Sequence, residues 1–296
     1  MLAGVLQQPG KLLKASLVIT AGVAGVELAG GYFSNSISLV SDAVHVFTDV
    51  MAIALSLFAL TLSARSHSGI MTYGYHRAEV LAALGNGITL SALSAWIILE
   101  AFQRVMMPRQ VDAPIMLAAA SIGLAGNVAV MLLLRQHATK SINIQSAFAH
   151  VIYDMVSSVT VIITGLVAYY SGLTIVDPLA AFLIAGLIAR SAYTIVRGST
   201  HILLEGAPRA LNVQEIATTL KQLDGVVDVH DLHVWTISTG LDAVSGHVVV
   251  RDQMLSQSRM ILDEITKVLQ ERYKISHATI QLEHEREVSF RTGSRQ

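Results

Sequence analysis

Six long apolar segments follow one another over the first two thirds of this chain, and they limit the folds open to it. Each is close to the roughly 20 residues that an α-helix needs to cross the hydrocarbon core of a bilayer. A membrane interior stabilises only structures that pair every backbone polar group internally, and segments of this length favour helices. The expected helices cover residues 12–33, 37–64, 78–105, 113–135, 145–170 and 176–197.

The composition supports a membrane protein. Of the 296 residues, 53% are hydrophobic and only 14% are charged, whereas soluble domains carry about 25% charged residues. The formal net charge is −1, which argues against nucleic acid as a partner. The chain contains no cysteine. A bound metal would therefore be held by His, Asp, Glu or water.

Basic residues gather on one side of the expected helices. The first, third and fifth connections carry few of them, namely Arg109, with Arg104 at a helix end. The positive-inside rule then predicts that both termini lie in the cytoplasm. The N-terminal segment shows no cleavage motif, so we interpret it as an anchor and not as a removed signal. The basic residues of the cytoplasmic side would be Lys11, Lys14, Arg65, Arg77, Arg135, Lys140 and Arg197.

Two pairs of residues inside the apolar segments share the spacing His-x-x-x-Asp. They are His45 with Asp49 in the second segment and His150 with Asp154 in the fifth. Residues four apart lie on one face of a helix. Ionisable side chains at membrane depth are costly and indicate a functional site. If the two helices face each other, two imidazoles and two carboxylates converge, as a tetrahedral Zn²⁺ site requires. Two identical pairs argue against simple hydrogen bonds between helices.

Other polar residues within the apolar segments are weaker signals. Asp42 lies three residues before His45 and could be a fifth ligand, a partner of His45 or a helix-packing group; the second and third roles are favoured. Glu27 and Asn127 could take part in proton passage, although a structural role is favoured. Asp177 precedes a proline, which is the pattern of an ordinary helix start.

After Arg197 the hydropathy falls, and the remaining chain has the pattern of a small α+β domain. The order helix, strand, strand, helix, strand is that of a truncated ferredoxin-like fold. The expected elements are a helix at 213–222, strands at 226–238 and 242–250, a helix at 256–273 and a strand at 277–283.

We therefore predict an all-α six-helix transmembrane domain plus an α+β ferredoxin-like cytoplasmic domain. The transmembrane transport domain would cover residues 1–203, and the cytoplasmic metal-binding and dimerisation domain 204–285. The cytoplasmic domain is small enough that we expect it to depend on a dimer partner. Residues 286–296 are predicted to be a flexible tail.

Histidines on the expected strands indicate a possible second metal site. The third strand places His277 and Glu283 on the same face, because successive side chains alternate along a strand. The sequence fits equally well with solvated polar positions on half-exposed strands. The candidate residues are His230, His233, His247, His277 and Glu283.

Several longer motifs accompany these residues. The membrane half contains SNSISLVSDAVHVFTD, YGYHRAEVLAALGNGITL and AFAHVIYDMVSSV, and the tail contains LLEGAP, HDLHVW and ISHATIQLE. Together they resemble the cation diffusion facilitator family, in particular its zinc-transporting branch. The resemblance extends from about Lys14 to Glu283. The short connection RQHATKSIN between the fourth and fifth segments is similar to the bacterial pattern.

The resemblance implies a homodimeric antiporter that exports Zn²⁺ from the cytoplasm in exchange for protons. By the resemblance, Zn²⁺ as transported substrate is bound by His45, Asp49, His150 and Asp154, and access to this site alternates between the two sides of the membrane. It further implies a regulatory Zn²⁺ in the cytoplasmic domain at His230, His247 and Glu283. The protein would be an integral protein of a bacterial inner membrane, surrounded by lipid, with no nucleic-acid partner.

Two other classes of protein were weighed against a transporter. A membrane-embedded metalloenzyme would need an open coordination position and a general base, but the sequence has no H-E-x-x-H and no nucleophile motif. A metal sensor has no need for a site at membrane depth. We therefore expect that the protein is not an enzyme.

Overall fold

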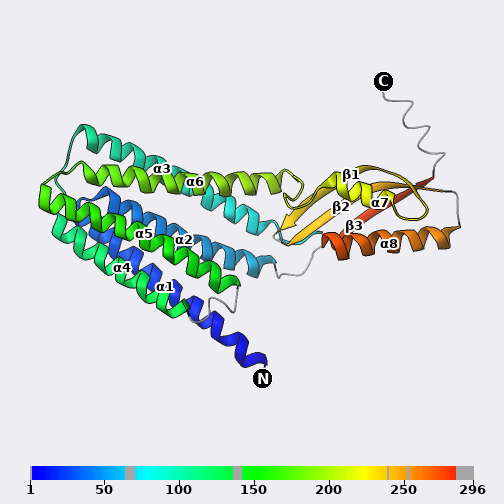
Figure 1. Cartoon of the computed structure of the whole chain (residues 1–296), viewed down its shortest axis with the longest axis horizontal. Helices are drawn as coiled ribbons and strands as arrows, with labels where there is room; N and C mark the ends of the chain where they lie inside the picture. Colours follow the sequence, from blue (N-terminus) through cyan, green and yellow to red (C-terminus); the bar gives the residue numbers. More distant parts are fainter. Residues whose placement is uncertain (1, 64–70, 136–141, 239, 252–253, 285–296) are drawn as a thin grey trace. The chain divides into compact units, whose positions relative to one another are not determined.

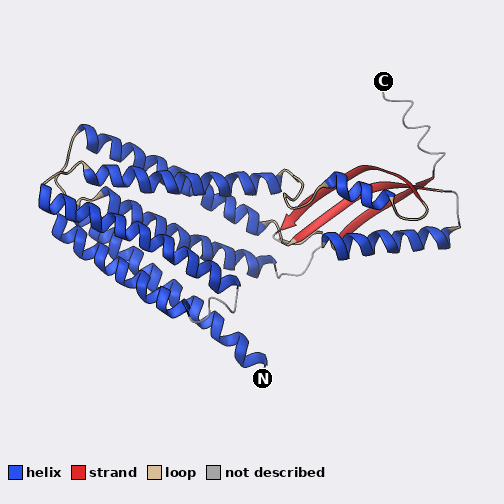
Figure 2. Cartoon of the chain, in the orientation of Figure 1, coloured by secondary structure: helices blue, strands red, loops and turns tan. Residues whose placement is uncertain are grey.

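The computed structural model describes residues 2–63, 71–135, 142–238, 240–251 and 254–284. The chain forms two compact units. The first comprises residues 1–58 and 82–196, and the second comprises residues 59–81 and 197–296. In the described part of the first unit all regular elements are helices, whereas the second contains a sheet and two helices of its own (Figure 2). The predicted flexible tail, 286–296, lies outside the described residues.

All six predicted apolar helices are present (Figure 1). The first begins at residue 2, before the predicted start at 12, and the sixth continues past 197 to residue 203. The predicted order and number of helices are therefore correct, and the differences lie at the ends. The helices are α1 (Leu2–Ser34), α2 (Ile37–Ser63), α3 (Ala78–Met106), α4 (Ala113–Arg135), α5 (Ile142–Ser171) and α6 (Val176–Leu203).

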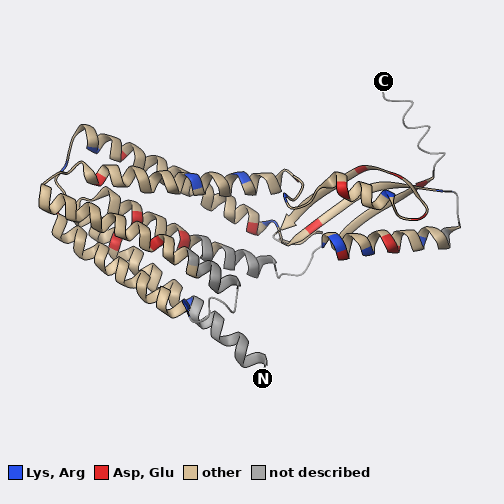
Figure 3. Ribbon diagram, in the orientation of Figure 1, with Lys and Arg blue, Asp and Glu red and all other residues tan. Residues whose placement is uncertain are grey.

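Five segments within the described residues are long and apolar enough to cross a membrane. They belong to α1, α3, α4, α5 and α6. The side chains at the C-terminal end of α2 lie outside the described part, so the sixth span stays a prediction from the sequence. Among the residues coloured by type, charged ones are sparse along the long helices and frequent in the second unit (Figure 3). The five segments are Lys14–Ser34, Ala78–Met106, Ala113–Arg135, His150–Ser171 and Val176–Leu203.

One apolar cluster contains residues from each of the five helices from α2 to α6. It is built from small and branched side chains, which permit close approach of helices in a membrane protein. A second cluster connects α3 with α6 through Ile97, Ala101, Ala181 and Ala185. The main cluster consists of Leu39, Leu90, Met116, Ala119, Ala120, Val161, Ile184, Ile188 and Ala192.

Glycines on α4 bring α1 and α4 into close contact. A Cβ atom at Gly123 would overlap with the carboxylate of Glu27, and one at Gly126 would overlap with Val23. Because these two positions of α4 carry glycine and have no side chain, α1 can approach α4 closely. Glu27 lies in this helix contact and is fully buried. Neither of its carboxylate oxygens has a hydrogen-bond partner among the described residues.

The start of α2 is held by a residue of α6. Asp177 is fully buried. Its carboxylate accepts hydrogen bonds from the hydroxyls of Ser36 and Ser38, both at 2.6 Å, and from the backbone N–H of Ile37 at 2.8 Å. Asp177 lies in the first turn of α6, as the sequence predicts, and its carboxylate also bonds to the start of α2, which the sequence did not indicate. The carboxylate caps the N-terminus of α2, whose first N–H groups lack partners within that helix.

The second unit follows the predicted order of elements, with each end within one residue of the prediction. Strands β1 and β2 are antiparallel, β2 and β3 are parallel, and β2 lies in the middle of the sheet. Ile216 and Leu220 of α7 and Ile265 and Leu269 of α8 pack in its apolar core. The elements are α7 (Val213–Lys221), β1 (Val226–Ser238), β2 (Leu241–Val250), α8 (Leu255–Tyr273) and β3 (His277–His284).

Candidate metal centres

The side chains of both His/Asp pairs come together between α2 and α5. Nε2 of His150 lies 3.1 Å from Oδ2 of Asp49 and 3.9 Å from Oδ2 of Asp154. Nε2 of His45 lies 3.9 Å from Oδ1 of Asp154, and its Nδ1 lies 3.5 Å from Oδ2 of Asp49. The two imidazole centroids are 6.2 Å apart. Each helix therefore contributes one imidazole and one carboxylate to a common group.

The spacing of these atoms fits a small divalent cation. Bonds of about 2.0–2.1 Å in a tetrahedral arrangement place ligand atoms about 3.3 Å from one another. The ligand atoms of His45, Asp49 and Asp154 lie within 4.8 Å of one another, and His150 is 3.1 Å from Asp49. His150 is not one of these three residues, but its contacts with Asp49 and Asp154 place it beside them. We call these four residues the α2–α5 group.

Asp42 lies one turn before His45 but is bonded to other helices. It is fully buried, and its Oδ2 accepts a hydrogen bond from the hydroxyl of Ser158 on α5 at 3.3 Å. Ser158 in turn accepts a hydrogen bond from the side-chain amide of Asn127 on α4 at 3.2 Å. Of the roles that the sequence left open for Asp42, this geometry matches that of a helix-packing group.

A second group forms on the sheet of the other unit. His230 on β1 pairs with His247 on β2, and Glu283 lies on the neighbouring strand β3. Oε1 of Glu283 lies 2.6 Å from Nδ1 of His247, and Oε2 lies 3.1 Å from Nε2 of His230. The two imidazoles stack with centroids 5.2 Å apart. We call these three residues the sheet group.

The sheet group has a ligand set that suits zinc. Two imidazoles and one carboxylate are three of the four ligands of a tetrahedral site, which leaves one position for water or a further ligand. The hydrogen bond from His247 is the largest effect that holds the pKa of Glu283 below its usual value, and the hydrogen bond from His230 acts in the same direction. Glu283 is buried and thus depends on these partners.

The two other histidines predicted for this site, His233 and His277, do not join the sheet group. His233 bonds to Asp231, with Nε2 3.1 Å from Oδ1. His277 lies at the start of β3, where its ring is 5.4 Å from that of Tyr73, also in the second unit. Asp231 has its other oxygen 3.9 Å from Nε2 of His247. Asp231 is not among the residues predicted from the sequence, and its position beside His247 depends on the pairing of β1 with β2.

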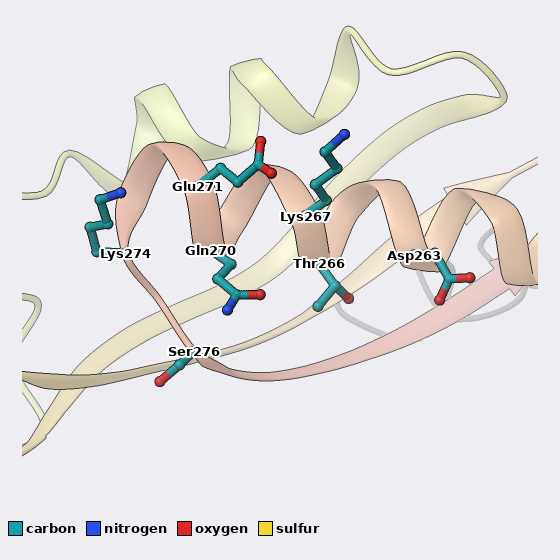
Figure 4. A pocket seen from close by; sticks show the side chains of 7 residues that line it. All are labelled: Asp263, Thr266, Lys267, Gln270, Glu271, Lys274 and Ser276. Carbon is teal, nitrogen blue, oxygen red and sulfur yellow. The ribbon is translucent and has the colours of Figure 1, made fainter.

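A separate pocket lies on α8 (Figure 4). Its side chains carry charges of both signs and are all exposed. None of them belongs to the α2–α5 group or to the sheet group, which are the groups of possible metal ligands found among the described residues. It is lined by Asp263, Thr266, Lys267, Gln270, Glu271, Lys274 and Ser276.

Both units match protein families. Residues 13–204 match the family described as cation efflux transmembrane domain. Residues 208–285 match the family described as cation efflux protein, cytoplasmic domain. The two matches together cover most of the chain and leave the boundary between them close to the end of α6.

Several characterised proteins are similar over most of their length. The cadmium, cobalt and zinc/H⁺-K⁺ antiporter of Bacillus subtilis is 38% identical, over 93% of this chain and 89% of its own. The zinc transporter ZitB of Escherichia coli is 35% identical, over 90% of this chain and 85% of its own. Among solved structures, the metal-bound C-terminal domain of the CzcD transporter from Cupriavidus metallidurans is 30% identical, over 25% of this chain and 99% of that one, with a TM-score of 0.23.

Proposed function

Because the chain belongs to the cation efflux family of transporters, we propose that it exports Zn²⁺ from the cytoplasm in exchange for protons. The names of its relatives in Bacillus subtilis and Escherichia coli support zinc as the ion, and the first of these names also supports proton exchange. The membrane would be the inner membrane of a bacterium, with both termini in the cytoplasm.

The observation that carries the proposal is the convergence of the α2–α5 group. Two imidazoles and two carboxylates meet on two apolar helices, where ionisable groups are costly unless they serve a function. This mixed set suits zinc and, less strongly, cobalt, nickel or cadmium, whereas a set of carboxylates alone would favour harder ions such as manganese. Tetrahedral Zn²⁺ would be bound by His45, Asp49, His150 and Asp154 as transported substrate.

Competition between zinc and protons supplies the coupling. An imidazole must be neutral and a carboxylate ionised to bind the metal, so loading zinc releases protons. Histidine changes its charge between about pH 5 and 8, the range that separates a cytoplasm from its surroundings. A membrane potential that is negative inside opposes export by about 2.3 kcal/mol per charge for each 100 mV. Protons returning inward offset this cost.

Alternating access would move α2 and α5 relative to the remaining helices. A site near the midplane can then open first to one side and then to the other without travelling itself. Asp177 ties the start of α2 to α6, eight residues before His45 and twelve before Asp49. We propose this contact as the pivot about which the ligand-bearing part of α2 moves.

The second unit would hold the dimer together and bind a regulatory Zn²⁺ at the sheet group. Its small core favours a second copy of the chain as partner. His230, His247 and Glu283 provide three ligands, and their position outside the long helices suits a role in sensing cytoplasmic zinc.

Zinc-dependent proton flux in proteoliposomes tests the proposal. A dye for zinc and a dye for pH inside the vesicles would report both ions for the wild type and for the His45→Ala, Asp49→Ala double variant. We expect zinc to enter as protons leave, in the wild type alone. Equal zinc movement in both proteins would refute the site, and zinc movement without proton movement would refute the coupling. Size-exclusion chromatography would verify that the double variant remains a folded dimer.

A further inference from the structure

One extra residue in β1 changes which side chains share the face of the sheet group. His230 pairs with His247, and His233 pairs with Ser245. Three steps along β1 thus correspond to two steps along β2, which defines a β-bulge. Paired residues point to the same side of a sheet, so the bulge brings His233 to the face that carries His230. Without the extra residue, strict alternation would place His233 on the opposite face.

The bulge has a clear local cause. Asp231 adopts a φ of 49°, in the left-handed region that Asp and Asn tolerate better than most residues. Gly246 lies opposite on β2, where an added Cβ would be 2.7 Å from Cδ1 of Leu232. The added Cβ would be 3.4 Å from the Cα of Leu232, so glycine gives the bulged strand room on this side.

The bulge places the carboxylate of Asp231 between two imidazoles. Oδ1 lies 3.1 Å from Nε2 of His233, and Oδ2 lies 3.9 Å from Nε2 of His247. The opposite nitrogen of His247, Nδ1, lies 2.6 Å from Glu283. Each ring nitrogen of His247 thus faces a different carboxylate, one inside the sheet group and one outside it.

We infer that Asp231 is a positioning residue for the metal site of the sheet group, because its carboxylate faces Nε2 of His247 and favours the tautomer that leaves Nδ1 as the metal-binding nitrogen. A neutral imidazole carries one N–H, and only its other nitrogen can bind a metal. A carboxylate beside Nε2 selects the tautomer that has the proton there, as in other carboxylate–histidine–metal arrangements. This inference rests on the zinc site that we propose for the second unit.

His233 completes the arrangement by holding the carboxylate. The 3.9 Å separation between Asp231 and His247 is longer than a hydrogen bond. The role that we infer for Asp231 requires its exposed side chain to rotate towards His247 when the metal binds. The hydrogen bond from His233 keeps the carboxylate on this face, so that it stays within reach of His247. His233 therefore acts through Asp231 and not as a ligand.

Zinc titration of the full-length dimer tests the role of Asp231. The Asp154→Ala background weakens the α2–α5 group, so that the remaining tight zinc binding reports on the sheet group. Asp231→Asn keeps the shape and the left-handed backbone but removes the charge. Asp242→Asn is the matched control, because Asp242 lies on the same strand pair and bonds only to Thr236 at 2.7 Å among the hydrogen bonds of the described residues.

We expect Asp231→Asn to weaken zinc binding about tenfold, the lower end of what loss of such a partner costs, and Asp242→Asn to leave it unchanged. Cobalt bound to Asp231→Asn should keep the tetrahedral absorption spectrum at saturation, since the ligands themselves remain. Equal affinities in both variants would overturn the inference. A changed spectrum would also overturn it, by making Asp231 a ligand. Absence of this zinc in the background itself would instead refute the proposed site.

Discussion

Asp177, in the first turn of α6, lies 2.6 Å from the hydroxyl of Ser36 at the start of α2, although 141 residues separate them in the sequence. The same carboxylate accepts the backbone N–H groups of Ile37 and Ser38. A buried negative charge at a helix N-terminus is stabilised both by these hydrogen bonds and by the helix dipole. The helix that carries His45 and Asp49 therefore begins at a point fixed by α6.

Replacing Asp177 with alanine should destabilise the membrane half strongly. The change leaves two hydroxyls and two N–H groups buried without their acceptor, and we expect a loss of about 2–4 kcal/mol. Thermal unfolding of the detergent-solubilised dimer would measure it. The control is Asp112→Ala, which removes the exposed cap that accepts the N–H of Ile115 at the start of α4 and should cost about 1 kcal/mol. Equal losses would show that burial of Asp177 does not matter.

The sequence predicted the two ligand pairs because their spacing is local. His45 and Asp49, like His150 and Asp154, share a helix face through the helical period alone. To predict that these faces of α2 and α5 meet, we had only to assume that four ionisable groups, costly to bury in a membrane, share one site. The function of Asp177 could not be predicted this way, since its partners on α2 are distant in the sequence. The position of Asp231 could not be predicted either, since it depends on a bulge and on the pairing of two strands.

Gly123 should tolerate alanine only if the carboxylate of Glu27 is removed. The new Cβ would overlap with that carboxylate, and such overpacking costs about 1–3 kcal/mol. Glu27→Ala in the same chain makes room, so the double variant should lose less than the sum of the two single variants. Unfolding midpoints of the wild type, the two single variants and the double variant would give the coupling energy between Gly123 and Glu27. Gly186→Ala is the control, because nothing lies within 4 Å of its added Cβ.

The stability of the second unit should depend on pH through Asp228. The hydrogen bond from Lys221, 2.5 Å away, holds the pKa of Asp228 below its usual value. The folded form therefore binds this proton more weakly than the unfolded chain does, and the stabilisation is complete above the unfolded pKa of about 3.9. It is lost as the pH falls through the lower, folded pKa.

Both partners of this pair are about half exposed, so its contribution should be no more than about 1 kcal/mol. Hydrogen exchange of α7 and β1 in the wild type and in Asp228→Asn, compared between pH 6 and 3, would measure it. The difference in hydrogen-exchange protection between the wild type and Asp228→Asn should shrink as the solution becomes more acidic. A difference that grows towards low pH would contradict the direction of the pKa shift.

His247→Ala should remove one zinc ion per protomer and leave the other in place. The variant loses one of three ligands of the sheet group, whereas the α2–α5 group shares no residue with it. Elemental analysis of the purified dimer should therefore fall from two zinc ions per protomer to one, and zinc transport should persist with a changed dependence on cytoplasmic zinc. His277→Ala, on the same sheet but in contact with Tyr73, should keep both ions. Loss of both ions in His247→Ala would mean that the two groups are not independent sites.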